Sequence, residues 1–308
     1  MIYQEKCGVC LVNKPVGYSS RYVLVKACEK LGLPDPSKVG YAGTLDPLAS
    51  GLLILLSGVA RKLQDYFTQH SKEYIGTVFF GASSETDDRE GPIHLHPNPK
   101  IPSLEEVSLS LESFQGKIWQ KPPKYSAIKI QGKRSHKIAR SGESIELKAR
   151  EVKIFSLQIL DYEYPRLSLK IHCSAGTYIR SLARDLGNLL ECDGYLESLC
   201  RISCGSFSLD NALPLEQLMP ESLIPLQEIL KNHPKLILPR SCWSKIRNKQ
   251  FIEISESSHD NPLLWIEDKL VALGRIKAGF LVAESILMPD LFQTPKPPEP
   301  DILVKQDL

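Results

Sequence analysis

The chain has 308 residues, 42% of them hydrophobic and 24% charged, which is enough apolar material for one large domain and one small domain. The formal net charge of +2 does not by itself indicate a nucleic-acid partner, and no apolar run approaches the roughly 18 residues that cross a bilayer. Because the N-terminus lacks a signal-peptide pattern and eight cysteines are scattered along the chain, we expect a cytoplasmic protein with reduced thiols.

The first half of the chain mixes helical and strand patterns. A helix is predicted over residues 21–31, with Ser19 or Ser20 as its N-cap. Residues 52–56 form a continuous apolar run that is typical of a buried strand, and residues 74–81 alternate like a strand with one buried face. These elements do not follow a regular βαβ alternation, so a doubly wound parallel sheet is not expected.

The second half continues the mixture. Ser103 and Glu106 have the spacing of a capping box and predict a helix that runs to about residue 114. Two further strands are predicted at residues 150–159 and 166–172. Thr177 is predicted to cap a helix over residues 178–190, whose leucines form an apolar stripe. The whole pattern indicates an α+β fold built on a substantial, largely antiparallel sheet with flanking helices.

The pattern changes near residue 233. Short strand-like runs at residues 262–266 and 270–274 are separated by turns, and prolines crowd the end of the chain from residue 295. We therefore expect a large domain at residues 1–232, a small β-rich domain at 233–290 and a disordered tail at 291–308.

A strongly basic segment lies in the middle of the chain. Between residues 117 and 140 there is no Asp or Glu, whereas Trp119 and Tyr125 lie among the cations. The eight cations are Lys117, Lys121, Lys124, Lys129, Lys133, Arg134, Lys137 and Arg140. Such a segment can contact phosphates and stack on bases, although a solvated basic face is the simpler interpretation of a charge run.

The most informative motif is residues 40–51, which surround Asp46. Glycines at 40, 43 and 51 permit close approaches or left-handed backbone, and Pro47 fixes its own φ and biases Asp46 away from helix. A rigid loop that presents one carboxylate is predicted. Asp46 is therefore a candidate catalytic acid, with the capping of a turn as the alternative.

This motif resembles the catalytic-aspartate motif of the TruB family of tRNA pseudouridine synthases. Five other segments match that family in the same order, and together the matches cover about three quarters of the chain. They are residues 13–20, 72–74, 122–129, 176–182 and 199–201. The resemblance implies a pseudouridine synthase-like fold and an abbreviated PUA-like RNA-binding domain at residues 233–290.

The resemblance also implies an activity, namely isomerisation of the T-loop uridine (position 55) of tRNA to pseudouridine. The base would be flipped out of its stack, no cofactor or metal would be needed, and the enzyme would act as a monomer. The implied catalytic residues are Asp46, Arg180 as its ion-pair partner, and Tyr74 as a stacking ring or general base. Whether Asp46 attacks the ribose, attacks the base or stabilises charge stays open.

Six further residues are implied to bind the tRNA T stem-loop. These are Lys14, Tyr41, Lys124, Lys129, Tyr178 and Leu199. Lys14 is expected mainly to shape the Asp46 loop, and Leu199 to lie on a helix. Tyr41 stands where the family carries a histidine that fills the space left by the flipped base, and His136 likewise replaces a tyrosine.

Two alternatives belong to other functional classes. One is an RNA-binding protein without catalysis, against which the presence of Asp46, Tyr74 and Arg180 together argues. The other is an aspartate-dependent glycosidase, which usually needs a second carboxylate, and the sequence offers no evident candidate near Asp46.

Overall fold

A computed structural model describes residues 7–126, 147–232, 234–254 and 261–288 in full, and the backbone of residues 129–130 and 133–134. The chain divides into two compact units, the first ending at Ile229 and the second beginning at Leu230. The predicted tail at residues 291–308, and five of the eight cations of the basic segment, have side chains outside the described residues. No helix in the described part is long and apolar enough to span a membrane.

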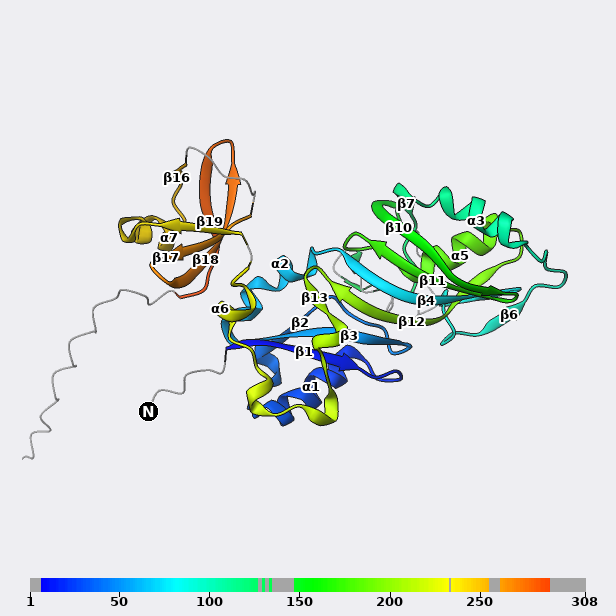
Figure 1. Cartoon of the computed structure of the whole chain (residues 1–308), viewed down its shortest axis with the longest axis horizontal. Coiled ribbons are helices and arrows are strands. Elements are labelled where there is room, and N and C mark those ends of the chain that lie inside the picture. The colour runs from blue at the N-terminus through cyan, green and yellow to red at the C-terminus, as the bar shows by residue number, and fades with distance from the viewer. Residues whose placement is uncertain are drawn as a thin grey trace, which may run out of the picture. The chain divides into compact units, whose positions relative to one another are not determined.

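The first unit is built on one ten-stranded sheet, whose main path runs β14-β1-β3-β12-β4-β11-β10-β7 (Figure 1). β13 pairs with β12, and β2 pairs with β3. Among the described strands of this sheet, every pairing is antiparallel except β1 with β14 and β3 with β12. The predicted α+β fold with a largely antiparallel sheet is thereby confirmed.

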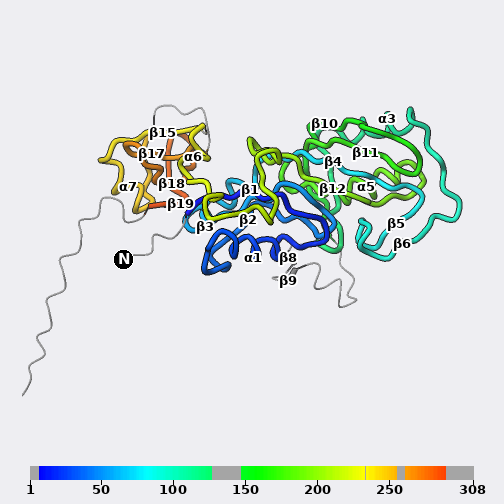
Figure 2. Tube along the Cα trace, turned by 60° about the horizontal axis from the view of Figure 1, so that its bottom comes forward, coloured from blue at the N-terminus to red at the C-terminus, as the bar shows by residue number. Residues whose placement is uncertain are grey.

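The strands of the first unit have the following bounds. The main sheet contains β1 Gly8–Lys14, β2 Val39–Ala42, β3 Ala49–Ser57, β4 Lys72–Phe80, β7 Gly116–Gln120, β10 Arg150–Glu163, β11 Arg166–Cys173, β12 Gly194–Cys204, β13 Phe207–Ser208 and β14 Leu213–Pro214. Two small hairpins lie outside it, β5 Ala82–Ser84 with β6 Ile93–Leu95 and β8 Lys129–Ile130 with β9 Lys133–Arg134 (Figure 2).

Helices cover the sheet of the first unit. Figure 1 shows α3 and α5 beside the half of the sheet with β10, β11 and β4, and α1 beside β1 and β2. Their bounds, with those of the shorter helices, are α1 Ser20–Leu31, α2 Gln64–Thr68, α3 Leu104–Glu112, α5 Ile179–Leu189 and α6 Leu226–Ile229. Apolar side chains from α1, α3 and α5 join those of the strands in one buried cluster.

Two helices begin where the capping signals predict. The Ser19 hydroxyl accepts the N–H of Tyr22 at the start of α1, and Gly32 ends that helix in the left-handed conformation. At α3 the Ser103 hydroxyl accepts the Glu106 N–H at 3.2 Å, while the Glu106 carboxylate accepts the Ser103 N–H at 2.8 Å. Both halves of the predicted capping box are therefore present.

The predicted Thr177 cap is wrong. Helix α5 begins at Ile179, and the Thr177 hydroxyl donates to the Ser174 carbonyl at 3.0 Å instead of accepting from the helix. The Gln120 side chain, from the end of β7, accepts the Tyr178 N–H at 2.8 Å and donates to the Tyr178 carbonyl at 3.0 Å. A residue distant in the sequence thus supplies the polar contacts at this helix entry.

The apolar run at residues 52–56 is the centre of the sheet. It lies in β3, which pairs with β1 on one side and, on the other, with β12 at residues 49–51 and β2 at residues 54–57. The side chains of the run are at most 1% exposed. The prediction of a buried strand is confirmed. Because β3 is fixed from both sides, the loop that precedes it is anchored in the core.

The second unit has its own sheet and core. Its five strands follow the order β15-β17-β18-β19-β16, and Ile246, Leu264, Ile266, Val271 and Leu281 are fully buried in its core cluster. The bounds are β15 Lys235–Leu238, α7 Trp243–Arg247, β16 Ile252–Glu253, β17 Leu263–Ile266, β18 Lys269–Lys277 and β19 Phe280–Ile286. The strand-like runs predicted at residues 262–266 and 270–274 correspond to β17 and β18.

Candidate active site

The loop that carries Asp46 is held by buried polar contacts on both sides. The Lys14 ammonium is fully buried and donates to the carbonyls of Ala49 at 2.5 Å and Pro15 at 2.9 Å. The Ser20 hydroxyl donates to the Leu45 carbonyl at 2.7 Å and accepts the Leu45 N–H at 2.9 Å. Burial lowers the pKa of Lys14 to about 8. These contacts give Asp46 the fixed position that the loop sequence predicts.

Arg201 ties the two ends of this loop together. Its side chain is buried, with Nε donating to the Leu52 carbonyl at 2.7 Å and Nη2 to the Gly43 carbonyl at 3.1 Å. Gly51 pairs with Arg201 across β3 and β12, has φ +97°, and a Cβ there would lie 2.3 Å from the Arg201 carbonyl oxygen. Gly51 is therefore required by the approach of β12, whereas Gly43 is favoured by its left-handed backbone.

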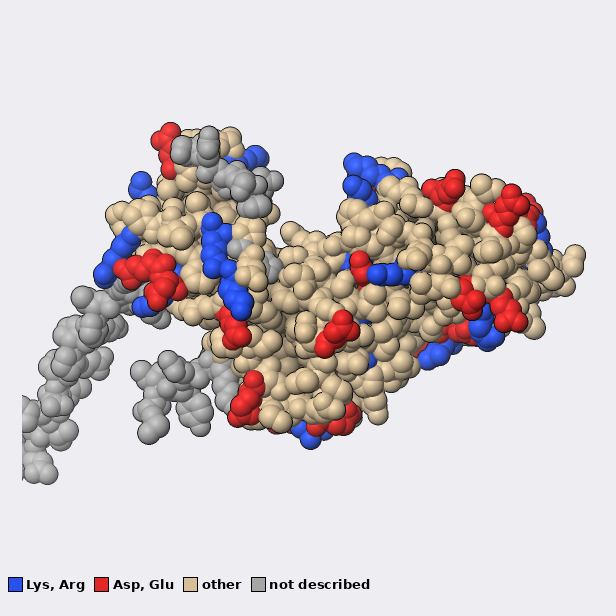
Figure 3. Space-filling view, viewed as in Figure 1, with Lys and Arg blue, Asp and Glu red and all other residues tan. Residues whose placement is uncertain are grey.

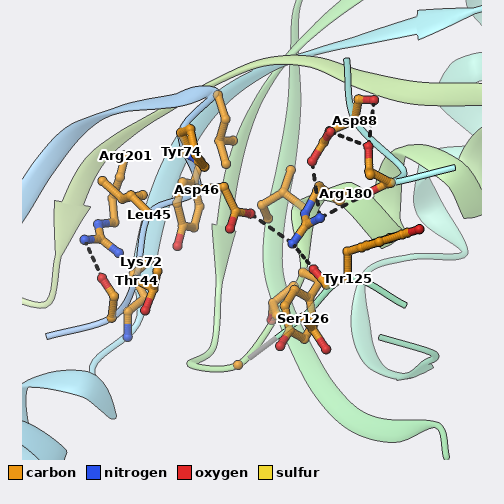
Figure 4. Close-up of a pocket in the computed structure, with 18 of the residues that line it drawn as sticks. Thr44, Leu45, Asp46, Lys72, Tyr74, Asp88, Tyr125, Ser126, Arg180 and Arg201 are labelled. Atoms are coloured by element: carbon orange, nitrogen blue, oxygen red, sulfur yellow. Dashed lines mark hydrogen bonds and ion pairs between the residues drawn. The ribbon is translucent and has the colours of Figure 1, made fainter. Parts of the chain in front are cut away.

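Arg180 lies between two carboxylates (Figure 4). Its Nη2 is 3.0 Å from Asp46 Oδ2, and its Nη1 is 3.2 Å from Asp88 Oδ2. The same nitrogens donate to the carbonyls of Tyr125 at 3.0 Å and Thr86 at 3.1 Å. Because the Arg180 side chain is only 7% exposed, these four acceptors fix its guanidinium.

The carboxylate of Asp46 is accessible, but its surroundings disfavour the ionised form. Its side chain is 42% exposed, so the carboxylate is accessible from the cavity described below. Desolvation raises the pKa of Asp46 above its ordinary value, and the neighbouring Asp88 raises it further, while Arg180 and Lys14 act in the opposite direction. The ion pair with Arg180 thus only partly offsets the destabilisation of the Asp46 carboxylate by desolvation and by Asp88.

Asp46 faces a cavity of about 860 Å³. Six residues predicted from the sequence line it, namely Tyr41, Asp46, Tyr74, Tyr178, Arg180 and Leu199. Lys14 and Lys124 are not part of its wall, since Lys14 is buried behind the loop and Lys124 is exposed on the surface. For Lys129 only the backbone, in β8, is described.

Tyr74 brings an aromatic ring to the cavity beside Asp46 (Figure 4). It lies on β4 between Ile171 of β11 and Arg201 of β12, and is 8% exposed. Burial raises the pKa of Tyr74 to about 12, although the charge of Arg201 lowers it. The hydroxyl is therefore protonated at neutral pH, and the ring is available for stacking.

Three other aromatic or apolar side chains complete the wall. Tyr41 lies on β2 and is half-buried, and Tyr178 lies just before α5 with the Arg150 guanidinium carbon 4.7 Å from its ring centroid. Leu199 was predicted on a helix, which is wrong, because it lies on β12 opposite Ala49 and Gly76. The main sheet, the Asp46 loop and the residues before α5 thus form part of the cavity wall.

Carboxylates near Asp46 were missed by the sequence interpretation. Asp88 and Glu90 line the same cavity, so the structure supplies candidates for a second carboxylate where the sequence offered no evident one. Asp88 is 2% exposed and accepts from the Thr86 hydroxyl at 2.6 Å and the Glu90 N–H at 3.0 Å. No local sequence pattern marks Asp88. It is connected to Asp46 only through Arg180, which pairs with both carboxylates and lies 92 positions after Asp88 in the sequence.

In the described part of the chain, no three His, Cys, Asp or Glu side chains are arranged so that they could hold a metal ion. The side chains of the basic segment are described only as far as Tyr125 and Ser126. Lys117 there pairs with Glu151 at 3.0 Å, and Trp119 is 73% exposed. On the face seen in Figure 3, basic and acidic side chains are interspersed, in accord with the low net charge.

Comparison with known proteins gives consistent matches. Residues 31–179 match the TruB family pseudouridylate synthase (N terminal domain). A tRNA pseudouridine synthase B of Clostridium kluyveri is 38% identical over 245 residues, which cover 78% of this chain and 83% of the relative. One from Borreliella burgdorferi is 37% identical over 269 residues, which cover 86% and 94%.

Two solved structures share the fold. A chain in the crystal structure of a Cbf5-Nop10-Gar1 complex has a TM-score of 0.69 at 21% identity, covering 92% of this chain and 85% of that chain. A chain in the structure of an H/ACA RNP bound to a substrate RNA containing 2′-deoxyuridine has a TM-score of 0.67 at 19% identity, covering 92% and 86%. At these identities the two structures bear on the fold alone.

Proposed function

The chain belongs to the TruB family of pseudouridylate synthases, and on that premise we propose that it isomerises the T-loop uridine (position 55) of tRNA to pseudouridine. The observation that carries the proposal is the Asp46 carboxylate, accessible from a cavity and paired with the buried Arg180. The relatives at 37–38% identity are named tRNA pseudouridine synthase B.

The reaction breaks the bond between the uracil nitrogen and the ribose, turns the base and joins it again through carbon. Nothing is oxidised or reduced, so the chemistry requires no redox cofactor. In this proposal Asp46 acts as nucleophile or as the group that stabilises charge while the base is detached. Arg180 holds the carboxylate in place, and Tyr74 stacks on the base.

A uridine in a folded tRNA must leave its stack to reach Asp46. The size of the cavity, about 860 Å³, and its aromatic and apolar wall of Tyr41, Tyr74, Tyr178 and Leu199 support the entry of one flipped nucleotide. Lys14 acts in this proposal by shaping the Asp46 loop. Lys124 and Lys129 act by contacting the RNA backbone outside the cavity.

We further propose that residues 1–232 form the catalytic domain and residues 233–290 an abbreviated PUA-like RNA-binding domain. The separate core and five-stranded sheet of the second unit support this division. Removal of that unit is expected to raise the tRNA concentration needed for half-maximal rate while the rate at saturation changes little. A cytoplasmic location and a monomeric state stay predictions.

The decisive test is incubation of the purified protein with unmodified tRNA labelled with tritium at C5 of its uridines, with release of tritium as the readout and chemical mapping of the product. We expect one pseudouridine in the T-loop and no release by Asp46→Asn. Asp65→Asn, an exposed carboxylate on α2, is the matched control and should retain full activity. Release by Asp46→Asn at the parental rate would contradict the assignment of Asp46.

A further inference from the structure

Among the described residues, four cationic side chains line the cavity, and three of them are bonded to protein groups. Lys72, Arg180 and Arg201 are each at most 6% exposed. Lys72 donates to the carbonyls of Thr68 and His70, whereas Arg180 and Arg201 make the contacts described above. These three cations therefore stabilise the walls of the cavity, although the buried Nε of Arg180 has no acceptor in the described part of the chain.

Arg150, the fourth of these cations, differs from the other three in its exposure. It is the first residue of β10 and is partly exposed. One nitrogen, Nη2, donates to the Gly176 carbonyl, while the buried Nε has no acceptor in the described part of the chain. Within the same described residues no carboxylate lies within 4 Å of its guanidinium, so its charge has no protein counter-ion there.

The position of Arg150 is fixed before any ligand arrives. Its guanidinium carbon is 4.7 Å from the centroid of the Tyr178 ring, a cation–π contact. Its neighbour across the sheet is Gln120, whose side chain holds the backbone of Tyr178 by two hydrogen bonds. Arg150 lies on β10, and Gln120 of the paired strand β7 holds the residue on whose ring Arg150 stacks. The Arg150 side chain is therefore already ordered, and little of its conformational entropy remains to be lost on binding.

A guanidinium that has no carboxylate partner among the described residues and is partly exposed in the wall of a cavity suits a phosphate group. From this arrangement we propose that Arg150 binds a phosphate of the RNA backbone beside the nucleotide that enters the cavity. The inference rests on the proposed function for its choice of RNA as the ligand. It assigns to Arg150 a substrate-binding role that is separate from the structural roles of Lys72 and Arg201.

The test measures RNA affinity in a thermodynamic cycle. All proteins carry Asp46→Asn so that binding is measured without turnover, and the RNA is a T-arm hairpin with either normal linkages or one neutral methylphosphonate on the 5′ or 3′ side of the target uridine. Arg150→Gln should weaken binding of the normal hairpin roughly 10- to 100-fold at low salt. It should also lower the slope of log affinity against log salt by about 0.7 to 0.9.

The methylphosphonate identifies the contact. At one of the two positions the neutral linkage should weaken binding to the parent, and Arg150→Gln should then cause no further loss. Lys153→Gln is the matched control, because Lys153 is an exposed cation on the same strand, stacked on Phe155 and outside the cavity. It should leave affinity within about twofold and the salt slope unchanged.

Additive losses at both linkages, or an unchanged salt slope, would overturn the proposal. Should Arg150→Gln not fold, as judged by its melting temperature, Arg150→Lys is used in the same cycle. Lysine keeps the charge but loses the forked donors, so a reduced coupling at the same linkage is expected and no coupling would again overturn it. Tritium release by the unsubstituted protein is measured separately, and its absence would overturn the proposed function while the binding cycle still decides the role of Arg150.

Discussion

Arg180 Nη2 lies 3.0 Å from Asp46 Oδ2, yet the pKa of Asp46 is raised and not lowered. An arginine at this distance ordinarily favours the ionised carboxylate. Here desolvation is the largest influence, and the charge of Asp88 on the far side of the same guanidinium adds to it. Arg180 is therefore shared between two carboxylates and only partly neutralises the one that faces the cavity.

The first prediction concerns the stability of Asp46→Asn. A carboxylate whose pKa is higher in the folded than in the unfolded state destabilises the fold wherever it is ionised. The neutral amide should therefore raise the melting temperature at pH 7, although it abolishes activity. The gain should shrink as the pH falls towards the ordinary range of Asp, about 3.9, because the parent carboxylate then becomes neutral too. A melting temperature that falls at pH 7 would contradict a raised pKa of Asp46 in the folded protein.

Asp88 provides the second prediction. It is 2% exposed and its Oδ2 is 3.2 Å from Arg180 Nη1, so Asp88→Asn removes one partner of a buried ion pair. The free energy of unfolding should fall by about 3–5 kcal/mol. The activity should also fall. The residual activity carries a more specific signature, because the charge of Asp88 raises the pKa of Asp46.

Removal of that charge should move the acidic limb of the rate–pH profile to lower pH. The profile of tritium release between pH 4 and 8 measures this shift. A variant that merely loosened the fold would lose rate at every pH and keep the position of the limb, which is the outcome that would contradict a direct electrostatic link.

Tyr74 provides the third prediction. With a pKa raised to about 12, its hydroxyl is ionised in only a minor fraction of molecules below pH 10. If the phenolate were the base, the rate would climb about tenfold per pH unit up to that value. We expect no such climb between pH 8 and 10.

Substitution separates the two roles of Tyr74. Tyr74→Phe should bind tRNA almost normally, whereas Tyr74→Leu should lose stacking worth about 1–3 kcal/mol per base. A Phe variant that turns over far more slowly at saturating tRNA would mean that the hydroxyl takes part in proton transfer as a neutral relay.

Gly51 provides the fourth prediction, for stability. Its φ is +97° and a Cβ would lie 2.3 Å from the Arg201 carbonyl oxygen, whereas Gly116, with φ +85°, has no atom within 4 Å of such a Cβ. Gly116→Ala should cost about 1–2 kcal/mol through its left-handed backbone alone. Gly51→Ala should cost about 1–3 kcal/mol more, because β12 must move away from β3. Equal losses in urea unfolding would show that the close approach is not limiting.

Some of the contacts on which these predictions depend could be predicted from the sequence, and others could not. The rigidity of the Asp46 loop followed from Gly43, Gly51 and Pro47, since their backbone restrictions are local and carry a physical meaning without any partner. Ser19 and the pair Ser103–Glu106 were informative for the same reason, because a cap acts within one helical turn.

The surroundings of the Asp46 loop were not predictable from local patterns. Arg180 was indicated only by the family resemblance, and no local pattern predicts that Asp88 contacts Arg180 or that Arg201 contacts Gly43. The Thr177 cap failed because contacts outside the predicted helix hold this segment: the Thr177 hydroxyl donates to the Ser174 carbonyl, and Gln120, 58 positions away, holds the backbone of Tyr178. The helix assignment of Leu199 failed because no local pattern marks its strand, β12. That strand is defined by its pairing with β3 and β4, which are distant in the sequence.

Tyr41, one of the two positions at which the resemblance implies a departure from the family pattern, lies half-buried on β2 in the cavity wall. If its ring fills the space that a flipped uridine leaves in the RNA, Tyr41→His should retain most activity. Tyr41→Ala should weaken productive binding, because the extruded state loses its substitute stacking partner, worth about 1–3 kcal/mol.

The size of the Tyr41→Ala defect should depend on the substrate. In full-length tRNA the uridine is stacked on its neighbours, so extrusion costs more free energy and loss of the Tyr41 ring should lower kcat/KM most strongly. In a short T-loop fragment whose loop is already open, less stacking is lost on extrusion, and the defect in kcat/KM should be smaller. Comparison of kcat/KM on the two substrates for the parent, the His variant and the Ala variant measures the difference. Equal defects on both substrates, or none on either, would make Tyr41 a packing residue of the strand before the Asp46 loop.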